Sequence, residues 1–318
     1  MKFVRVNRHR LCPVCGRSDW CAFNSTIAIC MRVESNKPIK NGGWLHKLSE
    51  PMLSVVQYTE TVETAVIAAP LEVRNEVYKA FLELLTLSPE HKNELQRRGM
   101  AEEQIIEFRS VPKVEKPWTI CQKLIEQGFE LSGIPGFYRA PNRHGGYYWT
   151  FKMKTGFIIP IKDKTKKIQA LQVRLDQPDS KGKYRLFSSS NKKAGSCSGV
   201  PVHVAIPQRI NDRRIWITEG PIKAAIASQY LGAVVLGLIG ATTWRPVLEI
   251  LRSKRPEVIL AFDRDQTVNI WVGRAVIELT KELIDMGIKV KQASWNNIFG
   301  NGLDEALVNS TEIKINEV

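Results

Sequence analysis

The sequence lacks several features that would assign it to common protein classes. It has no uninterrupted stretch of about eighteen apolar residues, so we expect no transmembrane helix and no membrane partner. No Gly-x-x-x-x-Gly-Lys-Ser/Thr motif occurs, and the chain therefore cannot supply a helicase motor by that route. The N-terminus is basic and shows no apolar leader, which indicates a cytoplasmic protein rather than a secreted, disulfide-linked one.

Length and charge set the broad class. At 318 residues the chain is long enough for two or three domains, each with its own core. It carries 46 Lys and Arg residues against 32 Asp and Glu residues, a formal net charge of +14. Such an excess favours a polyanionic partner whose phosphates meet a basic surface, although charge alone does not identify that partner.

Two apolar segments in the C-terminal third run directly into carboxylates. Residues 214–220 end in Glu219 and Gly220, and residues 257–265 end in Asp263 and Asp265. The hydrophobic pattern between them predicts a helix at residues 221–231, a strand at residues 233–238 and a second helix at residues 245–254. The order is therefore β-α-β-α-β, with the acidic side chains at one edge.

These acids predict a metal site. The carboxyl ends of parallel strands meet at one edge of a sheet, so Glu219, Asp263 and Asp265 should share one crevice. Asp after a strand is also common as a turn or helix-capping residue, and one such site alone would be structural. Two acidic strand ends separated by a full crossover favour a divalent cation, because clustered carboxylates repel one another without one.

The same segment resembles a TOPRIM domain, the metal-binding fold shared by bacterial-type primases, topoisomerases and some nucleases. The resemblance spans roughly residues 211–310 and includes a helix at 268–286 and a strand at 288–290. Many TOPRIM domains carry a further acid two positions after the second Asp, where this chain has Thr267. Asp304 is then the alternative ligand.

A cysteine cluster lies near the N-terminus. Cys12 and Cys15 flank two residues in a C-x-x-C arrangement typical of a zinc knuckle. Cys21, Cys30 and His46 follow, so five candidate ligands compete for four tetrahedral positions.

A hairpin is expected to place the second pair of ligands. Residues 20–23 and 27–30 have strand patterns around a polar turn, and in a zinc ribbon the second pair lies at the end of such a hairpin. This favours Cys30, with His46 as the natural fourth ligand and Cys21 as the alternative. The ribbon resembles the N-terminal zinc-binding domain of TOPRIM primases.

Three basic strands precede the acidic segment. Residues 156–163, 167–174 and 182–188 form a strand-turn-strand series with Lys and Arg at the strand ends. The series is similar to the basic subdomain of bacterial-type primases, and this resemblance implies that Arg174 and Lys183 contact template and nucleotide phosphates. The alternative is that these side chains only form the solvated face of a sheet.

The predicted organisation is an α/β chain in four parts. Residues 1–50 form a zinc β-ribbon, and residues 51–110 form a linker and helical region. Residues 111–210 form a mixed, basic primase-core subdomain, and residues 211–318 form a TOPRIM domain with a Rossmann-like parallel sheet.

The order of these parts resembles a DNA primase of the kind carried by phages, plasmids or mobile elements. The resemblance implies synthesis of short RNA primers on single-stranded DNA from ribonucleoside triphosphates, with a separate replicative helicase as partner. It also implies structural Zn²⁺ at the cysteines and Mg²⁺ or Mn²⁺ at Glu219, Asp263 and Asp265. Two alternatives remain, a TOPRIM nuclease that uses water as nucleophile and a non-catalytic replication protein that binds single-stranded DNA.

Overall fold

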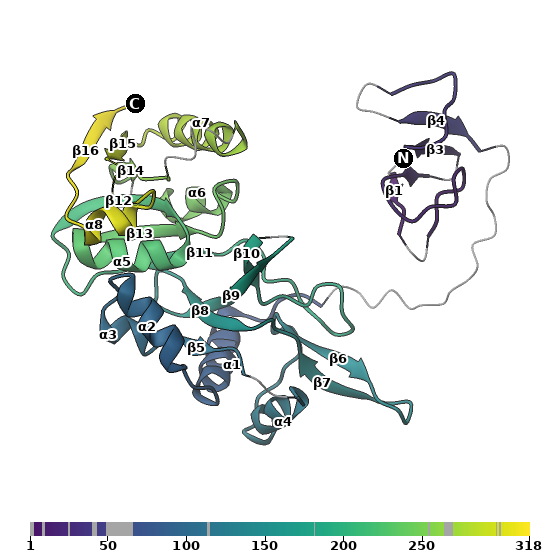
Figure 1. Ribbon diagram of the computed structural model, residues 1–318, viewed down its shortest axis with the longest axis horizontal. Coiled ribbons are helices and arrows are strands. Elements are labelled where there is room, and N and C mark those ends of the chain that lie inside the picture. Colours follow the sequence, from purple (N-terminus) through teal and green to yellow (C-terminus); the bar gives the residue numbers. More distant parts are fainter. Residues whose placement is uncertain are drawn as a thin grey trace. The chain divides into compact units, whose positions relative to one another are not determined.

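The computed structural model divides into two compact units, residues 1–62 and 63–318, which are treated separately (Figure 1). The structure describes residues 3–7, 10–24, 26–39, 43–48, 66–112, 115–180, 182–253, 255–263, 270–296, 298 and 300–318. The expected linker after residue 50 lies largely outside them. Contacts separate the chain near residue 62, so the further boundaries at 110 and 210 stay predictions.

The first unit is a small antiparallel sheet. Its four strands are paired in chain order: β1 (Val4–Arg5), β2 (Ala22–Phe23), β3 (Ile27–Cys30) and β4 (Trp44–Lys47). The expected hairpin is β2 and β3, and in its turn the Asn24 carboxamide oxygen accepts hydrogen bonds from the backbone N–H groups of Thr26 and Ile27. The core contains little more than Val6 and three cysteines, which is too small to stabilise a fold by burial alone.

The second unit begins with helices packed on an antiparallel sheet. The sheet order is β10 (Gly182–Leu186), β9 (Ile168–Asp179), β8 (Gly156–Lys162) and β5 (Arg109–Ser110). One face contacts α1 (Leu71–Glu83) and α4 (Trp118–Glu126), together with the hairpin of β6 (Phe137–Pro141) and β7 (Tyr147–Phe151). The ring of Phe81 lies within 5.9 Å of three other phenylalanine rings, measured between centroids, and forms the centre of this core.

Two short helices, α2 (Pro89–Arg97) and α3 (Glu102–Ile105), are held against the same sheet. The His91 ring hydrogen-bonds Ser110 Oγ at 2.7 Å and Asp176 Oδ1 at 2.9 Å, and Ser110 Oγ also accepts the backbone N–H of Ser88 at 2.8 Å. The residue types are those of a hydrolytic triad, but the serine oxygen is occupied by two partners within a helix-sheet contact. This series of hydrogen bonds therefore fixes α2 to β5 and β9.

The C-terminal part of the second unit is a six-stranded sheet with helices on both faces. The strand order is β11 (Val202–Ala205), β13 (Ala233–Leu238), β12 (Asp212–Glu219), β14 (Val258–Leu260), β15 (Val290–Trp295) and β16 (Ile313–Glu317). The four inner strands are parallel and the two edge strands antiparallel. Mixed α/β architecture is thus confirmed.

Side-chain alternation explains the two helical layers (Figure 1). Ile217 of β12 faces the core formed with α6 (Arg245–Leu251) and α7 (Ile270–Asp285), whereas its neighbour Trp216 faces the core formed with α5 (Pro221–Leu231) and α8 (Leu303–Val308). Successive side chains of a strand point to opposite faces of the sheet. A strand with a continuous apolar run therefore packs against a helical layer on each face.

One strand begins later than the sequence predicts. The strand expected at residues 288–290 starts at Val290 and continues to Trp295. The cause is the end of α7, where Gly287 has a φ of +75° and the Ile288 N–H donates to the Leu283 carbonyl at 3.0 Å. This Schellman motif extends the helix terminus over the first residues of the expected strand.

None of the helices in the described part of the chain has the length and apolarity needed to cross a bilayer.

A buried histidine makes folding of the second unit sensitive to pH. His203 of β11 is 8% exposed, and its Nδ1 accepts the backbone N–H of Lys162 at 3.1 Å. Burial, with a smaller contribution from the Lys162 charge, lowers the pKa of His203 from 6.5 to about 3. Between these values the unfolded chain binds a proton that the folded chain does not, so stability falls as pH decreases below about 6.5.

His203→Asn should reduce this pH dependence, because an amide oxygen can replace Nδ1 as acceptor without titrating. His203 should contribute a slope of up to about 1.4 kcal/mol per pH unit below pH 6.5, and that contribution should vanish in the variant. Urea unfolding at pH 7 and pH 5 measures it, with His144→Asn in the exposed β6–β7 turn as control. Equal pH slopes for native protein and His203→Asn would contradict the assignment.

Candidate functional site

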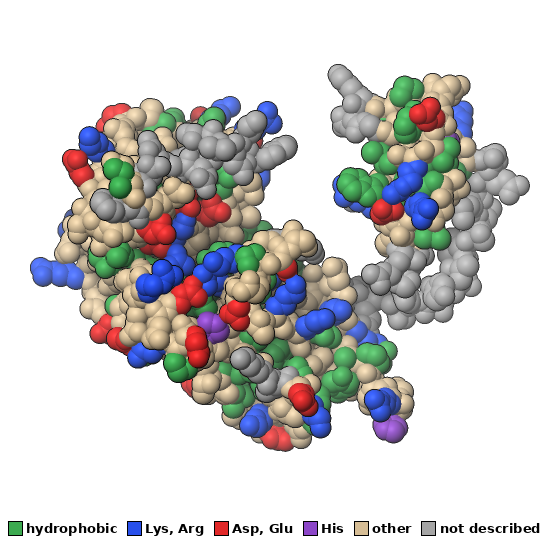
Figure 2. Space-filling view, in the orientation of Figure 1, with side chains coloured by type: hydrophobic (Ala, Val, Ile, Leu, Met, Phe, Trp, Pro, Cys, Tyr) green, Lys and Arg blue, Asp and Glu red, His purple; other side chains and the backbone are tan. Residues whose placement is uncertain are grey.

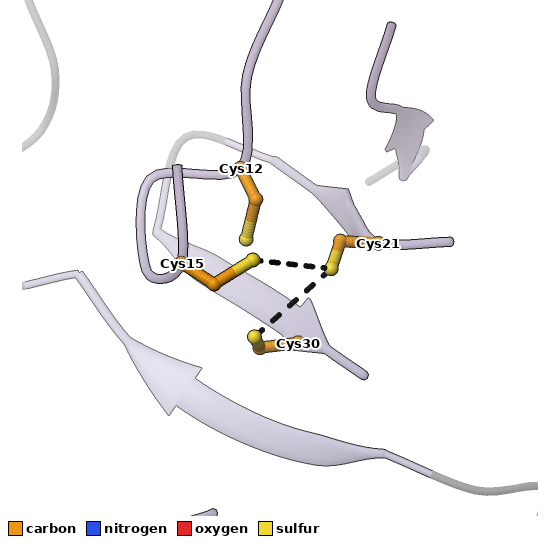
Figure 3. A group of neighbouring side chains, drawn as sticks. All are labelled: Cys12, Cys15, Cys21 and Cys30. Carbon is orange, nitrogen blue, oxygen red and sulfur yellow. Dashed lines mark hydrogen bonds between the residues drawn. The ribbon is translucent and has the colours of Figure 1, made fainter. Parts of the chain in front are cut away.

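Four cysteines converge in the first unit. The Sγ atoms of Cys12, Cys15, Cys21 and Cys30 all lie within 4.8 Å of one another (Figure 3). The Cys15 and Cys21 sulfurs are 3.8 Å apart, and those of Cys21 and Cys30 are 4.0 Å apart. Sulfurs bound to one tetrahedral zinc at 2.3 Å would be about 3.8 Å apart. The donor set and its spacing therefore fit a structural zinc ion.

The fourth member of this group is Cys21, the alternative to His46 in our prediction, and its assignment as the fourth zinc ligand is a proposal. The hairpin register pairs Ala22 with Ile29, so Cys21 lies across from Cys30. His46 is paired with Ala28, two residues before Cys30 in β3, and its Nε2 lies 3.0 Å from the Val33 carbonyl oxygen. Two residues of a strand span roughly 6.6 Å, which places His46 outside the sulfur cluster.

The thiols titrate at very different pH values without metal. Burial raises the pKa of Cys21 to about 12 and also raises that of Cys12. Burial acts in the same direction on Cys15, but hydrogen bonds from the Arg17 backbone and from the neighbouring thiols outweigh it and lower its pKa to about 7. Cys15 therefore loses its proton more readily than Cys12 and Cys21, whose protonated forms are favoured mainly by burial.

The second candidate site lies at the carboxyl edge of the parallel sheet. Ile217 of β12 is paired with Leu260 of β14, and the Ala261 N–H donates to the Ile217 carbonyl at 2.8 Å. This register brings Glu219, the last residue of β12, and Asp263, three residues after β14, to the same edge. Both are half-buried.

The expected third acid, Asp265, lies outside the described residues. Within the described part of the chain, the only group of three or more Cys, His, Asp or Glu side chains arranged to hold a metal is the cysteine cluster. The three-carboxylate site therefore stays a prediction.

A lysine that sequence reasoning missed lies at this edge. Lys223, in the first turn of α5, forms an ion pair with Asp263. The pair borders a cavity of about 560 Å³, whose other lining residues are Ile298, Gly300, Asn301, Gly302 and Glu305. A lysine in the first turn of a helix opposes the helix dipole, and that unfavourable placement was the available signal in the sequence.

Asp304 is held by an arginine. Its side chain is 2% exposed, and Oδ2 accepts a hydrogen bond from Arg98 Nη2 at 2.7 Å. Burial alone would lower the pKa of Arg98, but the charge of Asp304 and the contact with Tyr184 outweigh burial and raise it. The structure shows an ion pair between Arg98, the C-cap of α2, and the buried Asp304 of α8, and the role of Asp304 as a metal ligand stays a prediction.

The two predicted phosphate-binding residues differ in exposure. Arg174 of β9 is 11% exposed, forms an ion pair with Glu94 and lies over the Phe157 ring at 5.3 Å. Lys183 of β10 is exposed to solvent. On the face of the second unit drawn in Figure 2, basic side chains are interspersed with acidic ones instead of forming a uniform surface.

Comparisons with known proteins agree with this architecture. Residues 208–314 match a family model described as a domain of unknown function (DUF3854). No curated protein matches the chain.

Several solved structures have a similar fold. One is the Aquifex aeolicus primase, with its zinc-binding and RNA polymerase domains, at a TM-score of 0.55 and 16% identity. The alignment covers 77% of this chain and 63% of that one, so this chain spans less than two thirds of its length.

Two further structures are similar over most of their length. The RNA polymerase domain of Mycobacterium tuberculosis primase DnaG in complex with double-stranded DNA has a TM-score of 0.52 and 15% identity, covering 75% of this chain and 78% of that one. A DNA primase domain from Pseudomonas aeruginosa has a TM-score of 0.50 and 16% identity, covering 76% and 75%. At such identities the similarity is one of fold.

Replacing Cys21 should release zinc, whereas replacing His46 should not. Cys21→Ala removes one of four thiolates from a site whose metal supplies on the order of 10 kcal/mol of folding free energy in zinc-finger peptides. Metal analysis of protein purified with zinc should show a near-complete loss for Cys21→Ala and a full complement for His46→Ala. The opposite pattern would restore His46 as the fourth ligand.

Breaking the ion pair between Arg98 and Asp304 should destabilise the second unit. Asp304→Asn leaves the half-buried guanidinium of Arg98 without its counter-charge, which costs up to about 3 kcal/mol. Urea unfolding without divalent metal measures the loss, and the Arg98→Met/Asp304→Leu double variant should recover most of it. Unchanged metal-free stability combined with weaker Mg²⁺ binding would instead identify Asp304 as a metal ligand.

Proposed function

We propose that this chain is a DNA primase of the TOPRIM class, which synthesises short RNA primers on single-stranded DNA from ribonucleoside triphosphates. The observation that carries the proposal is the placement of Glu219 and Asp263 at adjacent carboxyl ends of parallel strands. The fold around them is similar to that of primase polymerase domains.

Glu219, Asp263 and Asp265 are the residues we assign to hold Mg²⁺ or Mn²⁺. Carboxylate oxygens are the ligands that these hard cations prefer. The cavity beside Asp263 is large enough for a nucleoside triphosphate. A divalent ion bound there would neutralise phosphate charge and lower the pKa of a primer 3′-hydroxyl. The carboxylates orient that ion, and the buried strands behind them keep their positions fixed.

Basic residues of the antiparallel sheet are assigned to the template and nucleotide. Lys183 is exposed and can meet a phosphate directly. Arg174 can bind a phosphate if its guanidinium leaves Glu94. The ring of Phe157 beneath the guanidinium keeps that group oriented. A structural neighbour bound to double-stranded DNA supports a nucleic-acid partner for this fold.

The cysteine cluster has a structural role in this proposal. Four thiolates close the coordination sphere of zinc and leave no position for substrate. The first unit would then present its sheet to the template. A separate replicative helicase is the partner we propose for duplex opening.

Glu219→Gln and Asp263→Asn should abolish primer synthesis while preserving the fold and DNA binding. Each replacement keeps side-chain size and removes a charge that holds metal, and losing several kcal/mol of transition-state stabilisation lowers the rate by at least about 100-fold. Labelled ribonucleotide incorporation on single-stranded DNA measures this, with Glu312→Gln at an exposed position as the matched control.

A parallel incubation without nucleotides separates synthesis from nuclease activity. Native-level synthesis by either variant would refute the catalytic assignment, and DNA cleavage without nucleotides would favour a nuclease instead.

A further inference from the structure

Lys223 places a positive charge inside the candidate carboxylate site. Its ammonium group forms an ion pair with Asp263, and the two side chains are 21% and 23% exposed. The pair borders the cavity at the carboxyl edge of the parallel sheet, so any ion or substrate in that cavity meets the lysine together with the acid.

The backbone around Lys223 fixes it there. Gly220, which has a φ of +94°, begins the turn into α5, and its N–H donates to the Leu238 carbonyl at 2.7 Å. On the opposite side lies Gly302, where an added Cβ would come within 3.3 Å of Lys223 Cε and 2.5 Å of Asp304 Oδ1. The lysine therefore occupies a narrow space between α5 and the loop at residues 300–302.

This ammonium group competes directly with a metal ion. Lys223 contacts one oxygen of Asp263, Oδ2, and carboxylate oxygens are also the ligands that a divalent cation prefers. Because the charges of the lysine and of a divalent ion repel, metal bound at this carboxylate favours displacement of Lys223 from Oδ2. The displaced ammonium group still lies at the wall of the cavity, where it can donate hydrogen bonds to an anion.

We propose that Lys223 is a built-in cation of the carboxylate site, which limits the site to one divalent ion and binds the nucleotide triphosphate when that ion displaces it from Asp263. The counter-ion role stands on the ion pair alone. The triphosphate role rests on the proposed function.

The test measures metal binding without catalysis. Mn²⁺ titrations by calorimetry should show one weakly bound ion for the native protein and at least fivefold tighter binding for Lys223→Met, because the competing charge is removed. Lys223→Arg keeps the charge and should bind Mn²⁺ like the native protein. Lys162→Met is the matched control, since Lys162 is also 21% exposed and is paired with Glu107, and both line a different cavity.

A second titration tests the anion. Binding of ATP at saturating Mn²⁺, which displaces Lys223 from Asp263, should weaken by about tenfold in Lys223→Met and stay near the native value in Lys223→Arg and Lys162→Met. Circular dichroism and thermal unfolding check each variant, and Lys223→Gln replaces Lys223→Met if the latter does not fold.

The outcomes separate the two hypotheses. Two ions bound by the native protein, or equal Mn²⁺ affinity in native protein and Lys223→Met, would overturn the counter-ion role. Unchanged ATP binding would overturn the triphosphate role. Tighter Mn²⁺ binding by Lys223→Met, in a protein that makes no primers, would support the counter-ion role and reject only the proposed function.

Discussion

The candidate catalytic site depends on one constraint, the parallel pairing of β12 with a strand on each side. β12 is hydrogen-bonded to β13 through Glu219 and to β14 through Ile217, and its register fixes how far each neighbouring strand extends toward the shared edge. The close approach of the first crossover depends on Gly237, where a Cβ would lie 2.9 Å from the Gly220 carbonyl oxygen. A side chain at that position would push away the turn that carries Lys223.

The charges of the second unit are organised as pairs more than as a surface. Buried or half-buried charges are stable only with partners, and three of them are paired across elements: Asp263 with Lys223, Asp304 with Arg98, and Arg174 with Glu94. On the face drawn in Figure 2, the side chains behind the net charge of +14 are interspersed with acidic ones. Lys183 is exposed, whereas Arg174 joins β9 to α2 through Glu94 and Arg98 joins the end of α2 to α8 through Asp304.

Much of the fold could be predicted from the sequence, because hydrophobic period and turn residues are local signals. The β2–β3 hairpin, the three basic strands and the alternation of β12, α5, β13, α6 and β14 all follow the expected pattern. The register of the same hairpin also explains why Cys21 joins the sulfur cluster, since pairing Ala22 with Ile29 places Cys21 opposite Cys30. Spacing along the chain alone did not show this, because register decides which side chains meet across a hairpin.

The contacts that sequence reasoning missed are those that join distant segments. Arg98 and Asp304 are separated by 206 positions, and Lys223 and Asp263 by 40. Neither pair has a local pattern, because each depends on how one element packs on another after both have formed. Asp304 could be predicted as an acid near the site but not as the partner of an arginine from α2.

The two candidate metal sites differ in what the fold requires of the ion. In the first unit, four buried or half-buried sulfurs face one another with almost no hydrophobic core around them, so a cation is needed both to neutralise thiolates and to stabilise the fold. In the second unit, Lys223 and Arg98 already neutralise carboxylates, and large apolar cores lie on both faces of the sheet. That unit can fold without a divalent ion, whereas the first unit depends on a cation at its four sulfurs.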